Sequence, residues 1–199
     1  MLKVYLLRHG ETQYNADGNK YCGRTDVWLT EKGLKQARLV FEQLKDKKID
    51  AVYSSPLERA RHTAKLATGS ETVETDTRII EIDFGDWEGK TKDEFIAEDP
   101  ASWNDWMDDP GTARAGRTGE SGKEVIARLE AFYNEMLRKH FNGTILVVGH
   151  NGINRLYMAH KLGMNLKHYR RIVQENSSVT EFELDNNGDF SLKKLNASG

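Results

Sequence analysis

The stretch that decides the fold is LKVYLLRH, residues 2–9. Its apolar run predicts a buried strand, because the strands of a parallel sheet are covered on both faces and lack polar alternation. The run ends in Arg8 and His9, so the predicted strand delivers a guanidinium and an imidazole at its carboxyl end. A second run, ILVV at 145–148, is the most apolar of the chain, and His150 follows it in the same way.

Further short strands and helical patterns alternate with these two strands along the chain. Strands are predicted at 49–53 and 74–76, and helices are predicted to begin at Thr30, Ser55, Ser121 and about Ile153. A terminal hairpin is predicted from strands at 179–184 and 190–195, joined by a turn at 186–188. This order predicts an α/β fold: a three-layer α/β/α sandwich with a mostly parallel central sheet and a C-terminal β-hairpin.

Two serines carry helix-start signals. Ser55 is a candidate N-cap, because a proline at the first helical position follows it and Glu58 completes a capping box. Ser121 and Glu124 form a second capping box. The helix after Ser121 shows an apolar stripe at helical spacing, formed by Val125, Leu129, Phe132 and Met136.

The segments on either side of Thr30 differ in character. Residues 13–29 hold several Gly, Asp and Asn residues and are predicted to be loop. The helix that begins at Thr30 is predicted to bury one face, formed by Leu34, Ala37, Phe41 and Leu44.

One region departs from the regular alternation. Residues 77–120 hold three of the four tryptophans among many Asp and Gly residues. This composition predicts an insertion with short helices that forms a small lid over the sheet edge. We therefore expect residues 1–199 to form a single domain that carries this lid.

Composition limits the function classes. The chain has 199 residues, and its 29 Lys and Arg nearly balance 31 Asp and Glu. Without a basic field, nucleic acid is not an expected partner. The single cysteine, Cys22, excludes an intrachain disulfide and a Cys-rich zinc site. The apolar runs fall far short of the roughly 20 residues of a membrane helix, so we expect no membrane partner and a cytoplasmic location.

Strand ends and a helix start bring together residue types that suit a phosphoryl group. Ligands bind at the carboxyl ends of strands in such sheets, where Arg8, His9 and His150 converge and Arg59 starts the next helix. Arginine binds a phosphoryl dianion through two parallel N–H groups, and a neutral imidazole can attack phosphorus. Asn15 offers an amide donor, the loop at Gly23 offers backbone N–H groups, and Asn151 follows His150 at the start of a helix.

Two other kinds of site are less consistent with the sequence. Residues 85–91, GDWEGKT, look like a phosphate-binding loop of nucleotide-binding proteins, but they have three residues between the glycines where four are required. A zinc site on His9, His150 and a carboxylate is disfavoured because two arginines would repel the cation. We therefore expect no metal ion and no cofactor.

Six segments in order along the chain resemble one family. They are LRHGET (7–12), GRTD (23–26), SSPLERA (54–60), EIDFGDWEG (81–89), GES (119–121) and VVGH (147–150). Together they resemble the signatures of the histidine phosphatase superfamily, the branch that includes cofactor-dependent phosphoglycerate mutases.

The resemblance implies a role for each matching residue. His9 would be the nucleophile that becomes phosphohistidine, Arg8, Arg59 and His150 would form the phosphate pocket with Asn15, and Glu81 would be the general acid. In a pocket walled by Phe84 and Trp87, desolvation would favour the protonated acid. Asp83 and Glu88 are the rival carboxylates. The arginines favour a neutral His9, and the bound phosphate favours a cationic His150.

The same resemblance implies an enzyme, and its alternatives stay open. The short form of the chain favours a phosphatase that acts on a small phosphorylated metabolite. A cofactor-dependent phosphoglycerate mutase and a catalytically inactive phosphate-binding regulator are the alternatives. Arg114 and Arg117 are candidates for an outer pocket that binds a second anionic group. A homodimer is compatible with this size.

Overall fold

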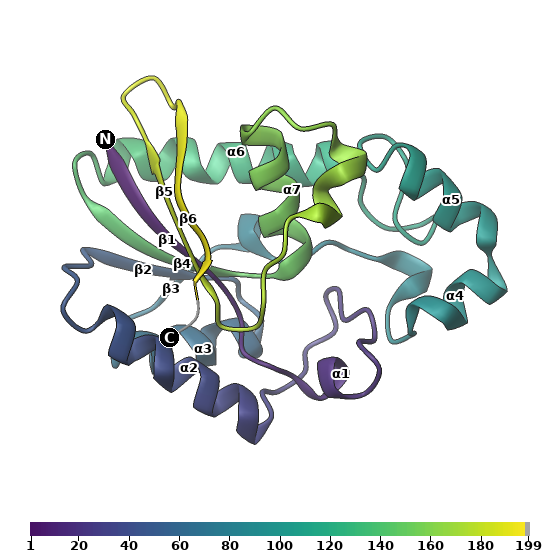
Figure 1. Ribbon diagram of the computed structural model, residues 1–199, viewed down its shortest axis with the longest axis horizontal. Helices are drawn as coiled ribbons and strands as arrows, with labels where there is room; N and C mark the ends of the chain where they lie inside the picture. Colours follow the sequence, from purple (N-terminus) through teal and green to yellow (C-terminus); the bar gives the residue numbers. More distant parts are fainter. Residues whose placement is uncertain (198–199) are drawn as a thin grey trace.

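A mixed six-stranded sheet forms the centre of the computed structural model, which describes residues 1–197 (Figure 1). Its strands are β1 (Leu2–Arg8), β2 (Ala51–Ser54), β3 (Glu74–Thr75), β4 (Thr144–Gly149), β5 (Val179–Leu184) and β6 (Phe190–Ala197). Their spatial order is β3-β2-β4-β1-β5-β6. The first four run parallel, whereas β5 and β6 form the antiparallel C-terminal hairpin. The predicted α/β class is confirmed.

Four helices cover the two faces of the sheet. The helices α2 (Glu31–Leu44) and α3 (Glu58–Thr68) lie on one face, and α6 (Gly122–Lys139) and α7 (Asn151–Lys161) lie on the other (Figure 1). Successive side chains of β1 alternate between them, as strand geometry requires. Tyr5 and Leu7 pack with the α2–α3 cluster, whereas Val4 and Leu6 pack with the α6–α7 cluster. Both faces of β1 are therefore buried, which explains its continuous apolar run.

The predicted helix starts are confirmed at Thr30 and Ser121 and wrong at Ser55. Thr30 accepts a hydrogen bond from the Gly33 amide, and Ser121 forms the predicted capping box with Glu124. In contrast, α3 begins at Glu58, and its N-cap residue Leu57 provides no side-chain cap. The Glu58 amide instead donates to Asp26 Oδ1 at 3.0 Å, so a carboxylate from a distant loop satisfies the helix end.

Two further details of the first third differ from expectation. The buried face of α2 is formed by Gly33, Ala37, Val40 and Leu44, whereas Phe41 is 36% exposed. The observed buried face is therefore rotated around the helix axis relative to the predicted face at 34, 37, 41 and 44. Residues 13–29 are mostly loop as predicted, but they include one short helix, α1 (Gln13–Ala16), which Thr12 caps.

The region 77–120 contains short helices, as expected. They are η1 (Thr77–Ile79), η2 (Gly85–Trp87), α4 (Lys92–Glu98) and α5 (Pro100–Asp108). Trp87 stacks on Phe95 with ring centroids 4.8 Å apart, and Trp106 donates to Tyr169 of η3 (Leu166–Arg171). This aromatic cluster holds α4, α5 and η3 together next to α7 (Figure 1).

Within residues 1–197, no helix is both long enough and apolar enough to cross a bilayer.

Candidate active site

The register of two parallel strands places His9 beside His150. Arg8 in β1 is the partner of Gly149 in β4, and the His9 amide donates to the Gly149 carbonyl at 3.2 Å. The two imidazole rings lie 5.1 Å apart between centroids, with a 60° angle between their planes. Both side chains are buried, with 5% of His9 and none of His150 exposed.

A cavity of about 220 Å³ opens at these strand ends. Six of the predicted site residues line it: Arg8, His9, Asn15, Arg59, Glu81 and Asn151. His150 is not among the lining residues, but its ring lies 5.1 Å from that of His9, which lines the cavity. Gly23 does not line the cavity either, although its neighbour Cys22 does. The structure therefore brings six of the eight predicted residues to one cavity.

Arg59 is held by the loop that contains Gly23. Its Nη2 donates to the Gly23 carbonyl at 2.7 Å, and its Nη1 donates to the Thr25 carbonyl at 2.8 Å. Gly23 has φ of +50°, and a Cβ there would lie 1.9 Å from Glu88 Oε1. The backbone N–H of Gly23 was expected to serve as a donor to the ligand. In the structure, its carbonyl instead accepts from Arg59 and holds that side chain in place.

Several buried polar atoms near His9 have no partner among the described residues. They are Nε of Arg8, Nε of Arg59 and both ring nitrogens of His150. Buried polar groups are almost always hydrogen-bonded, so such a concentration of donors needs an explanation. An oxyanion in the cavity would provide the acceptors that these cations and this imidazole lack.

Arg8 is anchored and partly buried. Its Nη1 donates to the Gln174 carbonyl at 2.9 Å. Burial lowers the pKa of its guanidinium to about 10; Glu81 opposes this shift, and the nearby Arg155 adds to it. An anion beside Arg8 would offset this unfavourable burial of charge.

His9 has the tautomer that a nucleophile needs. Its Nδ1 lies 2.7 Å from the Gly10 carbonyl oxygen, so Nδ1 carries the proton and Nε2 keeps its lone pair. Burial lowers the pKa of His9 well below its ordinary value, and Arg59 and Arg8 lower it further. The expectation of a neutral His9 therefore agrees with its surroundings, with burial as the main cause.

His150 is also surrounded by features that favour its neutral form. Burial lowers its pKa well below the ordinary value, followed by the charge of Arg59 and the neighbouring His9. A cationic His150 would thus require the negative charge of a bound phosphoryl group. The cationic form of His150 stays a prediction.

These shifts predict the titration of the two histidines. Because both pKa values are lowered, the proton is absent above the folded-state pKa, and both rings should stay neutral as pH falls through 6.5. Nitrogen-15 NMR of the imidazoles should show that the rings of His9 and His150 do not titrate between about pH 7.5 and pH 6. The signal of the His9 ring should be missing in the His9→Ala variant, and in the wild type it should show the proton on Nδ1. A His9 signal that titrates near 6.5 would contradict this prediction.

Glu81 is the carboxylate of the cavity. Three backbone amides donate to it: Ile82 and Ile153 to Oε1 at 3.0 and 3.1 Å, and Gly152 to Oε2 at 3.2 Å. The expected apolar wall is only partly present, because Phe84 lines the cavity but Trp87 packs into the aromatic cluster instead. The carboxylate is therefore oriented by the start of α7.

The two rival carboxylates lie outside the cavity. Glu88 accepts from the amides of Arg24 and Thr25 and from the Thr25 hydroxyl, so it organises the loop that holds Arg59. Asp83 accepts from the Gly85 amide and is ion-paired with Arg24. Of the three candidate carboxylates, only Glu81 reaches the site.

Asn15 is fixed in orientation by the loop after His9. Its Oδ1 accepts from the amide and hydroxyl of Thr12 and from Asn176 Nδ2. Asn176 also donates to the His9 carbonyl at 3.0 Å. These bonds occupy the oxygen of Asn15 and leave its NH₂ group for the cavity.

Cys22 contributes a thiol rather than a thiolate to the wall. Its Sγ donates to the Thr25 carbonyl, and burial raises its pKa to about 11. This agrees with a packing role in the loop.

The expectation that Arg114 and Arg117 line an outer part of this cavity is wrong, and two other arginines line it. Arg114 and Arg117 do not line the cavity, since they pair with Glu124 and Asp99 on the surface. Arg155 of α7 and Arg170 of η3 line it instead, together with Tyr21 and Tyr169. Arg155 lies one helical turn after Asn151, a spacing that could have identified it.

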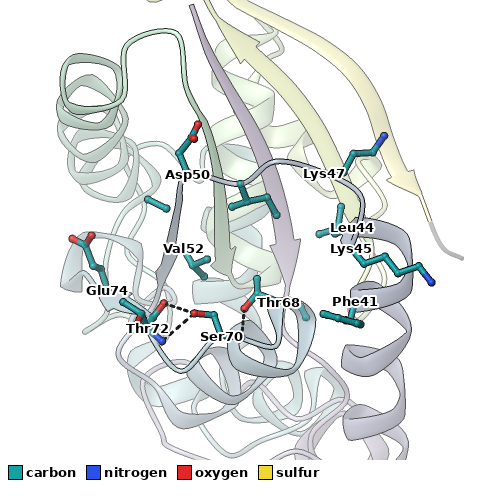
Figure 2. A pocket seen from close by; sticks show the side chains of 13 residues that line it. Phe41, Leu44, Lys45, Lys47, Asp50, Val52, Thr68, Ser70, Thr72 and Glu74 are labelled. Atoms are coloured by element: carbon teal, nitrogen blue, oxygen red, sulfur yellow. Dashed lines mark hydrogen bonds between the residues drawn. The ribbon is translucent and has the colours of Figure 1, made fainter.

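A second cavity, of about 360 Å³, lies at the other end of β2 (Figure 2). Its walls come from the ends of α2 and α3, with charged side chains such as Lys45 and Glu74 around it (Figure 2). Its polar groups bond locally, as in the bonds of Ser70 to Thr68 and Thr72. It holds none of the unpartnered buried donors found near His9.

Within residues 1–197, no three His, Cys, Asp or Glu side chains are grouped so that they could hold a metal ion.

Known proteins resemble this chain over nearly its whole length. The model of the histidine phosphatase superfamily (branch 1) matches residues 4–198. Phosphoserine phosphatase 1 of Hydrogenobacter thermophilus is 32% identical over 97% of this chain and 92% of its own. Adenosylcobalamin/alpha-ribazole phosphatase of Escherichia coli is 34% identical over 82% of this chain and 80% of its own. The crystal structure of a phosphoserine phosphatase mutant from Entamoeba histolytica in complex with phosphoserine has a TM-score of 0.90, with 30% identity, and covers 99% of this chain and 98% of that one.

Proposed function

Because this chain belongs to the histidine phosphatase superfamily, we propose that it hydrolyses a small phosphorylated metabolite through a phosphohistidine on His9, without a metal ion. The family and its phosphatase relatives make the chain a phosphoric monoester hydrolase. The proposal concerns the residues that carry the reaction and the kind of substrate.

Substrate binding would use the unpartnered donors at the strand ends. The guanidinium groups of Arg8 and Arg59 would neutralise the phosphoryl oxygens, and Asn15 and His150 would donate to them. Donors fixed in advance stabilise the charge that develops during transfer at no cost of reorganisation. The bound dianion would also favour the cationic form of His150.

In the first chemical step, the Nε2 lone pair of His9 would attack phosphorus. The bond between phosphorus and the leaving oxygen breaks, and Glu81 delivers a proton to that oxygen. The products are the free alcohol and a phosphohistidine. In the second step Glu81 takes a proton from water, the resulting hydroxide attacks phosphorus, and the P–N bond breaks. Inorganic phosphate leaves, with His9 and Glu81 restored.

The observation that carries this proposal is the tautomer of His9. Its Nδ1–H donates to the Gly10 carbonyl, so Nε2 is the atom left to react. Without that bond, the histidine could present either nitrogen.

The direct test is hydrolysis of p-nitrophenyl phosphate by the wild-type protein with and without EDTA. Since arginines supply the positive charge, turnover should change by less than about twofold on chelation. A metal-dependent phosphatase in the same buffer serves as the control for effective chelation. Loss of activity with EDTA and its recovery on addition of Zn²⁺ would contradict the proposal. Rapid conversion of 3-phosphoglycerate to 2-phosphoglycerate, in place of hydrolysis, would favour the mutase alternative.

A further inference from the structure

The cavity holds more positive charge than one phosphoryl group requires. Four arginines line it, Arg8, Arg59, Arg155 and Arg170, and Glu81 is its one lining carboxylate. Lys20 also lines it but is paired with Asp17. Arg8 at the end of β1 and Arg59 at the start of α3 are the two charges that act on His9, so they account for the phosphoryl group. Arg155 and Arg170 remain without an assigned partner.

Neither of these two arginines is neutralised by the protein. Among residues 1–197, no carboxylate lies within ion-pair distance of Arg155 or Arg170, although most other arginines on the molecule are paired. Burial lowers the pKa of Arg155, and the charge of Arg170 lowers it further. Burial also acts to lower the pKa of Arg170, but Tyr21 and Tyr169 together raise it. An anion bound at this end of the cavity would therefore offset above all the unfavourable burial of the Arg155 charge.

Aromatic and amide contacts hold both guanidinium groups in position. Arg155 lies over the Tyr169 ring at 5.1 Å from its centroid, and its Nη1 is 3.4 Å from Asn151 Oδ1. Its Nε is buried and has no partner among the described residues. Arg170 lies 4.9 Å from the Trp103 ring centroid and donates to the Tyr21 hydroxyl at 2.9 Å.

We propose that Arg155 and Arg170 form a subsite for a second oxyanion on the substrate, a carboxylate or a second phosphoryl group. The inference rests on the proposed function, because it takes the first phosphoryl group to lie beside His9. A guanidinium presents parallel N–H donors that match either oxyanion. The cavity of about 220 Å³ is below the usual range for drug-sized ligands, so the two anionic groups would be separated by only a few bonds.

Substrates that differ by one anionic group provide the test. O-Phosphoserine is O-phosphoethanolamine with one added carboxylate, and propane-1,3-diol bisphosphate differs from its monophosphate by one phosphoryl group. In at least one pair, the wild type should prefer the member that carries the second anionic group. A preference in the first pair would identify that group as a carboxylate, and a preference in the second pair would identify it as a phosphoryl group. Arg155→Gln should lower kcat/KM for the preferred compound by about 10- to 100-fold, chiefly through KM, and should lower it at least tenfold less for the other member.

Control variants separate this role from a structural one. Arg114→Gln removes an exposed, ion-paired arginine outside the cavity and should leave the ratio between paired substrates unchanged. Arg155→Lys keeps the charge without the two parallel donors and should give an intermediate ratio. If Arg155→Gln does not fold, as judged by circular dichroism, Arg170→Gln tests the same subsite from η3.

The possible failures are distinguishable. Hydrolysis of p-nitrophenyl phosphate without discrimination in either pair, or equal losses for both members in the variant, would overturn the subsite alone. If no phosphomonoester is hydrolysed, the proposed function fails. Calorimetric binding of both substrate pairs to the His9→Ala variant then still decides the subsite, since equal affinities within each pair would overturn it.

Discussion

The His9→Ala variant is expected to lose at least about 10⁴-fold in kcat/KM for p-nitrophenyl phosphate, because it lacks the atom that forms the covalent intermediate. In the wild-type protein, the Nδ1–H bond to Gly10 orients Nε2, and the low pKa of the ring keeps it unprotonated. Steady-state hydrolysis at pH 7 measures the loss.

The control for this prediction is His160→Ala. His160 is an exposed histidine on α7, paired at 3.6 Å with Glu130 and outside the cavity. Its removal should change kcat/KM by less than about twofold, as is usual for surface substitutions. Both variants should keep the wild-type circular dichroism spectrum. Retention of a hundredth or more of the activity in His9→Ala would remove His9 from the role of nucleophile.

The part of the site that the sequence could predict lies at the ends of buried strands. His9 and His150 each follow an apolar run, and parallel pairing of two such runs places both residues at one edge of the sheet. Arg59 follows β2 by a few residues, and β2 pairs with β4 in the same register. These positions depend on local pattern and on one simple rule of sheet topology, so they could be inferred without coordinates.

The rest of the site depends on long-range packing that leaves no local signal. Arg170 reaches the cavity because η3 packs against α5 and α7 through Trp106 and Tyr169. By contrast, Arg114 and Arg117 were candidates because of their charge, yet their guanidinium groups pair with carboxylates on the surface. The positive charge of the residues could not show that Arg155 and Arg170 line the cavity whereas Arg114 and Arg117 do not.

Local signals also failed where tertiary contacts replaced them. Ser55 and Glu58 carry a complete capping box, but Asp26 caps the first amide of α3 from the loop that also holds Arg59. Trp87 was expected beside Glu81, but it is taken up by the aromatic cluster with Phe95. In the first case a residue far away in the sequence replaced the near one, and in the second case aromatic packing decided where the tryptophan side chain lies.

The Glu81→Gln variant is expected to lose about 10²- to 10⁴-fold in kcat/KM for alkyl phosphates such as phosphoserine, because the amide cannot give a proton to the leaving alkoxide. The loss for p-nitrophenyl phosphate should be much smaller, since nitrophenolate leaves without help. A carboxamide oxygen can still accept from Ile82 and Ile153, so the start of α7 should remain in place. The matched control is Asp83→Asn, which alters the rival carboxylate outside the cavity and should cost less than about threefold.

The two roles proposed for Glu81 predict a further result with p-nitrophenyl phosphate. The first step needs little acid catalysis with this substrate, but the second step still needs a base to activate water. Glu81→Gln should therefore release about one equivalent of nitrophenol in a rapid burst, followed by slow turnover, as the phosphohistidine accumulates. Equal losses for both leaving groups with no burst would mean that Glu81 only orients α7. A burst that disappears when His9 is also changed to Ala would link the accumulated phosphoryl group to His9 itself.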